Sequence, residues 1–450
     1  MHPSIFRAYD IRGVYGKDIT KDDVEIIGNS LARVLKENKV VIGRDVRVSS
    51  EDVSKAFING LRRAGKDVVD VGMVSLGVGS LYAWKRKLPF AYITASHMPA
   101  DWTGIKFFSS NGIGFMEEDN HKIRDLSLKG KMESPGGEPG RIENENTEKV
   151  IEEYVEFLLS KIMPKKKMKV LLDCGNGAAC VVARKLFEKA GFDVDVLFEE
   201  PDGSFPNRSP DNFEDPLTVA KERVRDFDFG IAYDGDGDRA VIIDCNGSVL
   251  TPEQTSYIIL EELIQKEKGP VIANVECTKV IDLIPEKFGR EVKRIRVGHT
   301  FLMDAVHRER ACFGAERAGH YVIPSIFPTD DSLAVSYYFA CVLSSNDSGL
   351  SEIAKGIPTY PFKRVNFECD DEKKFMVMNR IKERMMKEHE NVNTLDGVRI
   401  DLERGWVLVR PSNTSPTIRL TMEGKDEQSF KEIKNRFSAI IEEEISGSGQ

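Results

Sequence analysis

The sequence predicts an α/β protein of four domains, three of related design and a fourth, C-terminal α+β unit. Three observations support this prediction. An apolar run, a polar or glycine-bearing turn, an amphipathic segment, a glycine and a second apolar run recur three times along the chain. The pattern stops near Gly356, and a different alternation of strands and helices follows. The 450 residues are 41% hydrophobic and 30% charged, which is enough apolar material for several cores.

The first copy of the pattern opens with the apolar residues 40–42 and turns through GRDVRVSS. A helix is predicted over residues 51–64, followed by Gly65 and a second apolar run at 68–71. Glycine directly after a helix suits the left-handed position that ends many helices. This copy therefore predicts a strand, a helix and a second strand.

The same order appears in a second copy over residues 170–197 and a third over residues 271–297. Two strands joined by a helix within about 30 residues form a right-handed crossover between parallel neighbours. The three copies thus predict three α/β units that each contain parallel strands.

The C-terminal part has different spacing. Its predicted elements are a strand at 362–369, a helix at 372–388, strands at 406–409 and 418–421, and a closing helix at 428–445. A Pro- and Gly-rich loop at 129–148 separates the first two units. We predict domains at residues 1–147, 148–250, 251–358 and 359–450.

Charge and composition exclude several classes of protein. Acidic residues outnumber basic ones 73 to 64, a net charge of −9, which argues against a nucleic-acid partner. The seven cysteines are scattered, so a disulfide framework is not expected. No signal peptide or stretch long enough to cross a membrane is recognisable. We expect a cytoplasmic protein without membrane contact, and the sequence leaves its oligomeric state open, a homo-oligomer included.

The sharpest motif is DGDGDR at residues 234–239, between two strand-like runs. Three carboxylates at alternating positions repel one another unless a cation joins them, and glycine lets the backbone curl around it. A calcium EF-hand loop needs glycine and glutamate where this chain has Arg239 and Cys245, so Mg²⁺ is favoured. The alternative is a hairpin with two Asp-Gly turns.

A second motif, TASHMP at residues 94–99, follows the apolar run 91–93. A serine at the exit of a buried strand is expected on an exposed loop, where functional residues concentrate. The motif differs from the nucleophile elbow of hydrolases, because His97 directly follows Ser96. An ordinary loop is the alternative.

Two further loops carry polar side chains. GAERAGH at residues 314–320 offers Glu316 and His320, which suit sugar hydroxyls, although turns often contain such residues. RPSNTSP at residues 410–416 gathers a guanidinium, hydroxyls and an amide, which suit a phosphate, although it also fits a hairpin loop.

Together, these four motifs resemble the α-D-phosphohexomutase family over nearly the whole chain. They occur in the family's order: phosphoserine loop, metal loop, sugar loop and phosphate loop. The family fold of four domains, the first three sharing an α/β core, agrees with the repeats. The segment AYDIRG at 8–13, the Gly298-His299 pair and Asn413 resemble the phosphomannomutase/phosphoglucomutase branch.

The resemblance implies a role for individual residues. Ser96 resembles the phosphorylated serine, whose phosphoryl oxygen would complete a Mg²⁺ site. The residues that resemble the other metal ligands are Asp234, Asp236 and Asp238. Those that resemble the catalytic groups around the phosphoryl group are Arg12, His97, Lys106 and Arg239. The sugar would be bound by His299, Glu316 and His320. The phosphate that is not reacting would be bound by Arg410, Ser412, Asn413 and Thr414.

The implied activity is a mutase that interconverts hexose 1-phosphate and hexose 6-phosphate, with mannose and/or glucose as the sugar. The small phosphosugar would react with phosphorylated Ser96 and pass through a hexose 1,6-bisphosphate. The chain departs from the family at Ala318, where a serine is usual, with bulky Arg317 beside it, and at Glu276, where a lysine is frequent. These departures keep two alternatives open, a phosphoglucosamine mutase and a non-catalytic phosphosugar-binding protein.

Overall fold

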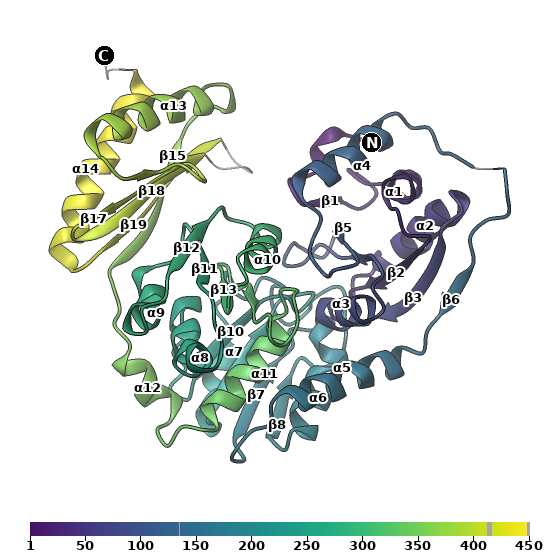
Figure 1. The fold of residues 1–450 in the computed structure, drawn as a ribbon, viewed down its shortest axis with the longest axis horizontal. Coiled ribbons are helices and arrows are strands. Elements are labelled where there is room, and N and C mark those ends of the chain that lie inside the picture. The colour runs from purple at the N-terminus through teal and green to yellow at the C-terminus, as the bar shows by residue number, and fades with distance from the viewer. Residues whose placement is uncertain (135, 412–415, 448–450) are drawn as a thin grey trace.

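The computed structural model describes residues 1–134, 136–411 and 416–447. Figure 1 shows four α/β units along an arc, with the first and the fourth at its two ends and the second and third between them. Each unit is built around one sheet. The predicted fold class is confirmed.

The first unit has a mixed sheet in the strand order β1-β5-β4-β2-β3-β6. Strands β2 and β3 are parallel, as the first repeat predicts, but β5 pairs antiparallel with both β1 and β4. The strands are β1 (Asp10–Val14), β2 (Lys39–Arg44), β3 (Asp67–Met73), β4 (Phe90–Ile93), β5 (Trp102–Phe108) and β6 (Ile142–Asn144). The helices are η1 (Pro3–Ile5), α1 (Lys21–Val34), α2 (Ser50–Arg63), α3 (Leu76–Lys85) and α4 (Glu117–Leu128).

The second unit has the strand order β10-β9-β7-β8. Strand β7 is parallel to β8 and β9, whereas β9 and β10 form an antiparallel hairpin whose loop carries the aspartate motif. The strands are β7 (Lys169–Asp173), β8 (Asp193–Leu197), β9 (Phe229–Tyr233) and β10 (Ala240–Asp244). The helices are α5 (Thr147–Lys161), η2 (Ala178–Val181), α6 (Ala183–Lys189), α7 (Thr218–Arg223) and η3 (Val224–Asp226).

The third unit has the strand order β12-β11-β13-β14, with β11 parallel to β12 and β13. The strands are β11 (Val271–Asn274), β12 (Val292–Ile295), β13 (Phe313–Ala315) and β14 (Tyr321–Val322). The helices are α8 (Pro252–Lys266), η4 (Lys279–Asp282), α9 (Leu283–Lys287), α10 (His299–Arg308), α11 (Ser332–Leu343) and α12 (Leu350–Gly356). All three repeats thus contain the expected parallel pair.

The fourth unit is an antiparallel sheet in the order β15-β19-β18-β17-β16. The strands are β15 (Phe362–Glu368), β16 (Val392–Asn393), β17 (Val398–Leu402), β18 (Gly405–Pro411) and β19 (Thr417–Gly424). The helices are α13 (Asp371–Glu388) and α14 (Glu427–Ser446). The predicted α+β organisation is therefore present.

Capping residues explain where two of the longer helices begin. Thr251 accepts a hydrogen bond from the backbone of Gln254, whose side chain in turn accepts one from Thr251, so that both ends of this capping box are satisfied at α8. Asp426 and Ser429 form the same arrangement at α14. Among the described residues, no helix combines the length and the apolar character that spanning a bilayer requires.

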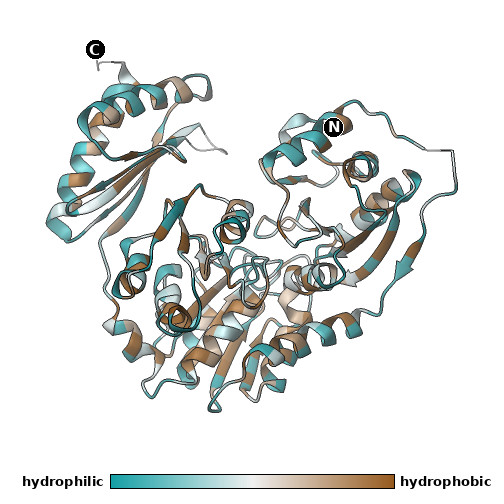
Figure 2. Cartoon of the chain, viewed as in Figure 1, coloured by the Kyte–Doolittle hydropathy of each residue, from teal (hydrophilic) through white to brown (hydrophobic). Residues whose placement is uncertain are grey.

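The buried apolar residues connect the first three units to one another but leave the fourth with a separate core. One buried cluster extends continuously through the first three units, with members such as Leu81, Tyr154 and Phe339. The fourth unit has its own cluster around Ile381, Leu420 and Phe437. Figure 2 shows the inner strands and helix α11 as hydrophobic and the outer helix faces as hydrophilic. The residue boundaries of the domains stay our proposal, since neighbouring units share one core.

Candidate active site

The predicted nucleophile lies in the loop that follows β4. Ser96 has a φ of 53°, in the left-handed region, and its backbone N–H donates to Thr94 Oγ1 at 2.8 Å. Its hydroxyl donates to Asp234 Oδ2 at 3.0 Å. The structure therefore brings the serine loop and the aspartate loop together across the boundary of the first two units.

The expectation that Ser96 is exposed is wrong, because its exposed fraction is 0%. The aspartate loop lies directly against the serine loop: a Cβ on Gly235 would stand only 2.5 Å from the carbonyl oxygen of Ser96. The partly exposed His97 lies beside the hydroxyl, with its Nδ1 3.4 Å from Ser96 Oγ. Two loops that pack this closely leave no solvent path to the hydroxyl in this arrangement.

The aspartate loop connects β9 to β10 and folds around its own first carboxylate. Asp234 Oδ1 accepts hydrogen bonds from the backbone N–H groups of Gly237 and Arg239, at 3.0 and 3.1 Å. Gly237 has a φ of 79°, which glycine adopts without strain. This local folding turns the three aspartates toward one another.

The aspartate cluster suits a divalent cation. The carboxylate oxygens of Asp234, Asp236 and Asp238 lie within 4.8 Å of one another, and all three residues are buried. In the described part of the chain, the Oδ1 atoms of Asp236 and Asp238 have no hydrogen-bond partner. Burial, and next the charges of Asp238 and Asp236, raise the pKa of Asp234 well above its ordinary value. Unpartnered buried oxygens and mutual repulsion are what a hard cation would relieve.

Lys106, in β5, supplies positive charge to the same cluster. Its Nζ donates to Asp236 Oδ2 at 2.9 Å and to Asp238 Oδ2 at 2.5 Å. Burial alone would lower the pKa of Lys106, but these two carboxylates outweigh burial and raise it. Arg12, in the neighbouring strand β1, pairs with Asp10 at 2.7 Å and has a buried Nε without a partner among the described residues.

His97 lies between cations. The charge of Arg239, then burial and the charge of Arg12, lower the pKa of His97 far below its ordinary value. The ring is therefore neutral at physiological pH, with a nitrogen next to the Ser96 hydroxyl. Because the nearby cations disfavour a second proton on the ring, the neutral imidazole serves as a hydrogen-bonding group beside the hydroxyl.

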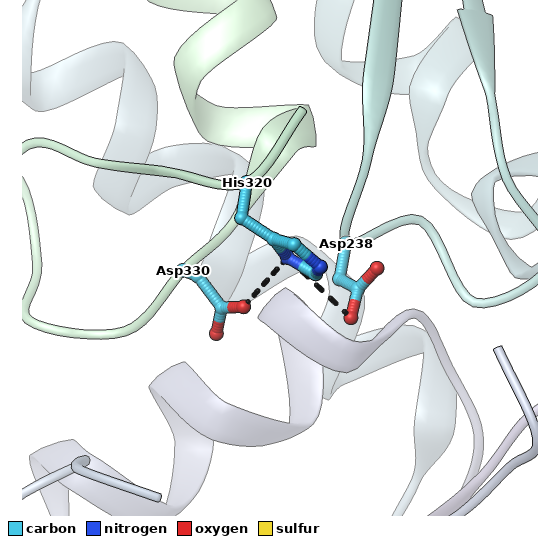
Figure 3. Close-up of side chains that lie close together, drawn as sticks. All are labelled: Asp238, His320 and Asp330. Atoms are coloured by element: carbon cyan, nitrogen blue, oxygen red, sulfur yellow. Dashed lines mark ion pairs between the residues drawn. The ribbon is translucent and has the colours of Figure 1, made fainter. Parts of the chain in front are cut away.

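Arg239 is oriented by a chain of buried side chains from the third unit. Its Nε–H donates to His320 Nε2 at 3.0 Å, so the proton of a neutral His320 is on Nδ1. This Nδ1 is 3.0 Å from Asp330 Oδ2 and 3.9 Å from Asp238 Oδ2. Figure 3 shows the His320 ring between the two carboxylates.

Asp330 also contacts His299, another of the candidate sugar-binding residues. Its Oδ2 is 3.1 Å from His299 Nδ1, and the His299 and His320 rings stack with their centroids 5.3 Å apart. Although burial alone would raise the pKa of Asp330, the two imidazoles lower it to about 2. The carboxylate is therefore ionised and holds both rings.

Glu316 lies at the end of β13, close to this cluster. Its Oε1 accepts hydrogen bonds from the Gly298 backbone at 2.7 Å and from Asn274 Nδ2 at 3.0 Å. Tyr9 of the first unit stands edge-on to His299, with 5.2 Å between the ring centroids. Elements of the first three units thus converge on one place.

The candidate phosphate residues belong to the sequence of the fourth unit. Arg410 is near the end of β18, and its Nη2 lies 3.0 Å from Glu276 Oε1. The other predicted phosphate ligands, Ser412, Asn413 and Thr414, lie outside the described residues.

Comparison with known proteins identifies the family of the chain. Models of four successive phosphoglucomutase/phosphomannomutase domains match it: alpha/beta/alpha domains I, II and III at residues 3–134, 152–247 and 251–360, and the C-terminal domain at residues 365–440. A probable phosphoglucosamine mutase of Methanopyrus kandleri is 33% identical, with 97% of each chain covered. The chain belongs to the phosphoglucomutase/phosphomannomutase family, the α-D-phosphohexomutases.

Two further comparisons extend this result. A phosphomannomutase/phosphoglucomutase of Pseudomonas putida is 32% identical, with 96% of this chain and 94% of that protein covered. The crystal structure of a phosphoglucomutase/phosphomannomutase family protein from Burkholderia thailandensis superposes with a TM-score of 0.90 at 27% identity, covering 99% of this chain and 98% of that one. As a phosphohexomutase, the chain is an enzyme, an intramolecular phosphotransferase, and the alternative of a non-catalytic binding protein is wrong.

Arg47 is a site residue of this phosphohexomutase that the sequence did not reveal. Its guanidinium is buried and donates to Asp45 and to backbone carbonyls of the serine loop, which belong to Ser96, Met98, Pro99 and Trp102. It lies in the GRDVR segment, and no sequence pattern shows which of the two arginines in that segment belongs to the site. Arg44, by contrast, only approaches Asp70 at 3.9 Å.

No sequence pattern points to Asp330 either, because a pair of aspartates after a proline and a threonine is typical of a turn. Another difference concerns Arg317, which does not crowd the sugar site. Its guanidinium pairs with Glu253 at 2.8 Å and covers the ring of Phe362 at 3.7 Å, at the junction with the fourth unit. Ala318 accordingly remains the departure within the sugar loop.

Proposed function

We propose that this phosphohexomutase interconverts the 1-phosphates and 6-phosphates of mannose and/or glucose through phosphorylated Ser96. The observation that supports this most strongly is the 3.0 Å contact between the Ser96 hydroxyl and Asp234, within a buried group of three carboxylates. A hydroxyl that merely completed a turn would not need such a charged environment.

Asp234, Asp236 and Asp238 would hold one Mg²⁺ together with an oxygen of the phosphorylated Ser96. When bound, Mg²⁺ neutralises charge on the phosphoryl oxygens. The direct contact between Ser96 and Asp234 has to open when the serine is phosphorylated, because two anionic groups at this distance repel each other. Since Ser96 is 0% exposed in the present arrangement, a sugar hydroxyl can reach its phosphoryl group only after the loops around it separate.

The surrounding cations would stabilise the transferring group. Arg239 reaches it on one side, and Arg12 and Lys106 lie near the attacking sugar hydroxyl. The bond between the Ser96 oxygen and phosphorus breaks as a bond from the sugar oxygen to phosphorus forms, and the proton that the sugar hydroxyl loses is taken up by the departing Ser96 oxygen, beside the neutral His97. Positioned charges of this kind supply most of the catalysis in phosphoryl transfer.

The product of this step is a hexose 1,6-bisphosphate. This intermediate reverses its orientation in the site and returns its other phosphoryl group to Ser96. Glu316, His299 and His320 would bind the sugar ring. Arg410, together with Ser412, Asn413 and Thr414, would bind the phosphate that is not reacting.

A second candidate is a phosphoglucosamine mutase. The Methanopyrus kandleri relative carries that name at 33% identity over 97% of this chain. Ala318 also removes a hydroxyl from the sugar loop. Both observations concern only the choice of sugar and leave the phosphoryl-transfer residues unchanged.

Parallel assays with mannose 1-phosphate, glucose 1-phosphate and glucosamine 1-phosphate in Mg²⁺ test the proposal. We expect turnover of mannose or glucose phosphate, and a fraction of the purified chain with one phosphate on Ser96 by intact-mass and peptide mass spectrometry. A preference of about tenfold or more in kcat/KM for glucosamine 1-phosphate would select the second candidate. Turnover without any phosphate on Ser96 would contradict the mechanism itself.

A further inference from the structure

A buried carboxylate lies beside Arg410, the described residue of the candidate phosphate site. Glu276, on the loop after β11, has an exposed fraction of 5%. Arg364 of β15 donates to its Oε2 at 3.0 Å, and Arg410 of β18 lies 3.0 Å from its Oε1. Both guanidinium groups come from the fourth unit, whereas the carboxylate comes from the third.

The arginines around Glu276 carry more charge than their carboxylates neutralise. Arg419 stands opposite Arg410 in the β18–β19 register, and burial, then Arg364 and Arg410, lower its pKa. Asp396 is the second carboxylate, 3.3 Å from Arg410 Nη1. Arg410 also keeps a buried Nε that has no partner among the residues the structure describes. Three guanidinium groups against two carboxylates leave room for another anion.

The loop of Glu276 is connected to the candidate sugar site. The Glu276 backbone N–H donates to Asn274 Oδ1 at 3.1 Å, and Asn274 Nδ2 donates to Glu316 Oε1 at 3.0 Å. A displacement of the Glu276 backbone would therefore shift Asn274 and, through it, the hydrogen bond to Glu316. This places the carboxylate between the groups that would bind the phosphate and the group that would bind the sugar ring.

We propose that Glu276 sets the affinity of the phosphate site, as the counter-ion that Arg410 releases when a substrate phosphate binds. The proposal rests on the assignment of Arg410 as a phosphate ligand in the proposed function. A phosphate dianion and a carboxylate around the same guanidinium repel each other, so binding has to overcome the Glu276 charge. The resulting low phosphate affinity suits a bisphosphate intermediate that must leave this site and change its orientation between two phosphoryl transfers.

The variant Glu276→Gln tests this, because it keeps the shape of the side chain and removes its charge. Calorimetry with inorganic phosphate and with glucose 6-phosphate should show binding tightened by about tenfold, the scale of one like-charge contact. In turnover assays, KM should fall by a similar factor, whereas kcat should fall or stay unchanged. Unchanged or weaker phosphate binding by Glu276→Gln would overturn the proposal.

The matched control is Asp401→Asn. Asp401 pairs with Arg399 of its own strand at 2.9 Å and with Lys279 across the same junction at 3.3 Å, but it is not one of the groups around Arg410. Phosphate affinity should not change in this variant. If both variants tightened phosphate binding equally, a general loosening of the junction would replace the specific role of Glu276.

A double-variant cycle separates this inference from the proposed function. In an Arg410→Gln background, Glu276→Gln should tighten phosphate binding clearly less than in the natural chain, because the guanidinium that the two anions share is gone while Arg364 and Arg419 remain. A full effect in that background would also overturn the proposal. If the single variant tightened phosphate binding but no hexose phosphate were turned over, the inference would stand and the proposed function would fall. If the natural chain turned over hexose phosphate but Glu276→Gln did not tighten phosphate binding, the proposed function would stand and the inference on Glu276 would fall.

Discussion

The two ends of the candidate active site are held in different ways. Around Ser96, loops of the first two units pack closely, the carboxylates of Asp234, Asp236 and Asp238 are buried, and the surrounding units share one continuous apolar core. Around Arg410, the fourth unit has its own core and, among the described residues, meets the third through a small cluster of Val275, Trp406 and Leu408 together with ion pairs and hydrogen bonds.

This difference separates two tasks. Phosphoryl transfer benefits from groups fixed in advance, because charge stabilisation is greatest where nothing has to reorganise. A phosphate site that accepts either end of a bisphosphate must bind and release, and ion pairs across a small interface can be exchanged for ligand contacts. We therefore expect substitutions at the first end to change mainly kcat, and substitutions at the second end to change mainly KM.

The largest effect should come from Ser96→Ala. Removal of the phosphoryl acceptor should lower kcat by about 10³-fold or more and abolish the phosphorylated form of the chain. A coupled mutase assay and intact-mass spectrometry measure both. The matched control, Ser80→Ala, removes a buried hydroxyl in α3 and should keep both. Full turnover by the Ser96 variant would contradict the assignment of phosphoryl transfer to the Ser96 end of the site.

Next in size is Arg47→Lys. Lysine cannot reproduce the forked contacts that hold Asp45 and the carbonyls of the serine loop, so kcat should fall by about 10²-fold with little change in KM. The level of Ser96 phosphorylation should fall as well. Steady-state kinetics and mass spectrometry check this, with the surface variant Arg86→Lys as the control. A change confined to KM would contradict a role in positioning Ser96.

A smaller effect is expected from Arg410→Gln at the second end. The loss of one guanidinium should raise KM for hexose phosphates by about tenfold and lower kcat less. Kinetics over a range of substrate concentrations separate the two. The control is Arg436→Gln, in the same unit but paired with Glu388 at its surface. An equal fall in kcat without a change in KM would remove the distinction between the two ends.

The smallest effect concerns how pH acts on the junction of the third and fourth units. Burial raises the pKa of Glu423 to about 7, although its Oε1 accepts the Lys279 N–H at 3.1 Å. A raised pKa favours the neutral carboxyl in the folded state, so this contribution is complete below the ordinary pKa of 4.5 and is lost as pH rises through about 7.

Differential scanning calorimetry should therefore show a melting temperature that falls by about 5 °C between pH 5 and pH 8. The variant Glu423→Gln should flatten this dependence. Glu368→Gln, on the exposed end of β15, should retain it. A Glu423 variant with the original pH dependence would show that the junction does not respond through this carboxyl.

Much of the architecture follows from local sequence patterns. Apolar runs and the glycines that follow helices predict the parallel pairs β2–β3, β7–β8 and β11–β12. Alternating aspartate and glycine likewise predicts a loop that gathers Asp234, Asp236 and Asp238, because the spacing itself brings the carboxylates together. The antiparallel position of β5 has no such local signal, since the pairing of strands depends on distant parts of the chain.

The sequence by itself determined the three repeats, the aspartate loop and the serine motif, since periodicity and short-range sterics act between near neighbours. Only the tertiary structure decided that Ser96 is closed off, that Asp330 holds His299 and His320, and that Glu276 opposes Arg410. Each of these relations joins residues far apart in the chain. Burial and electrostatic interaction depend on distance in space, which the order of residues does not contain.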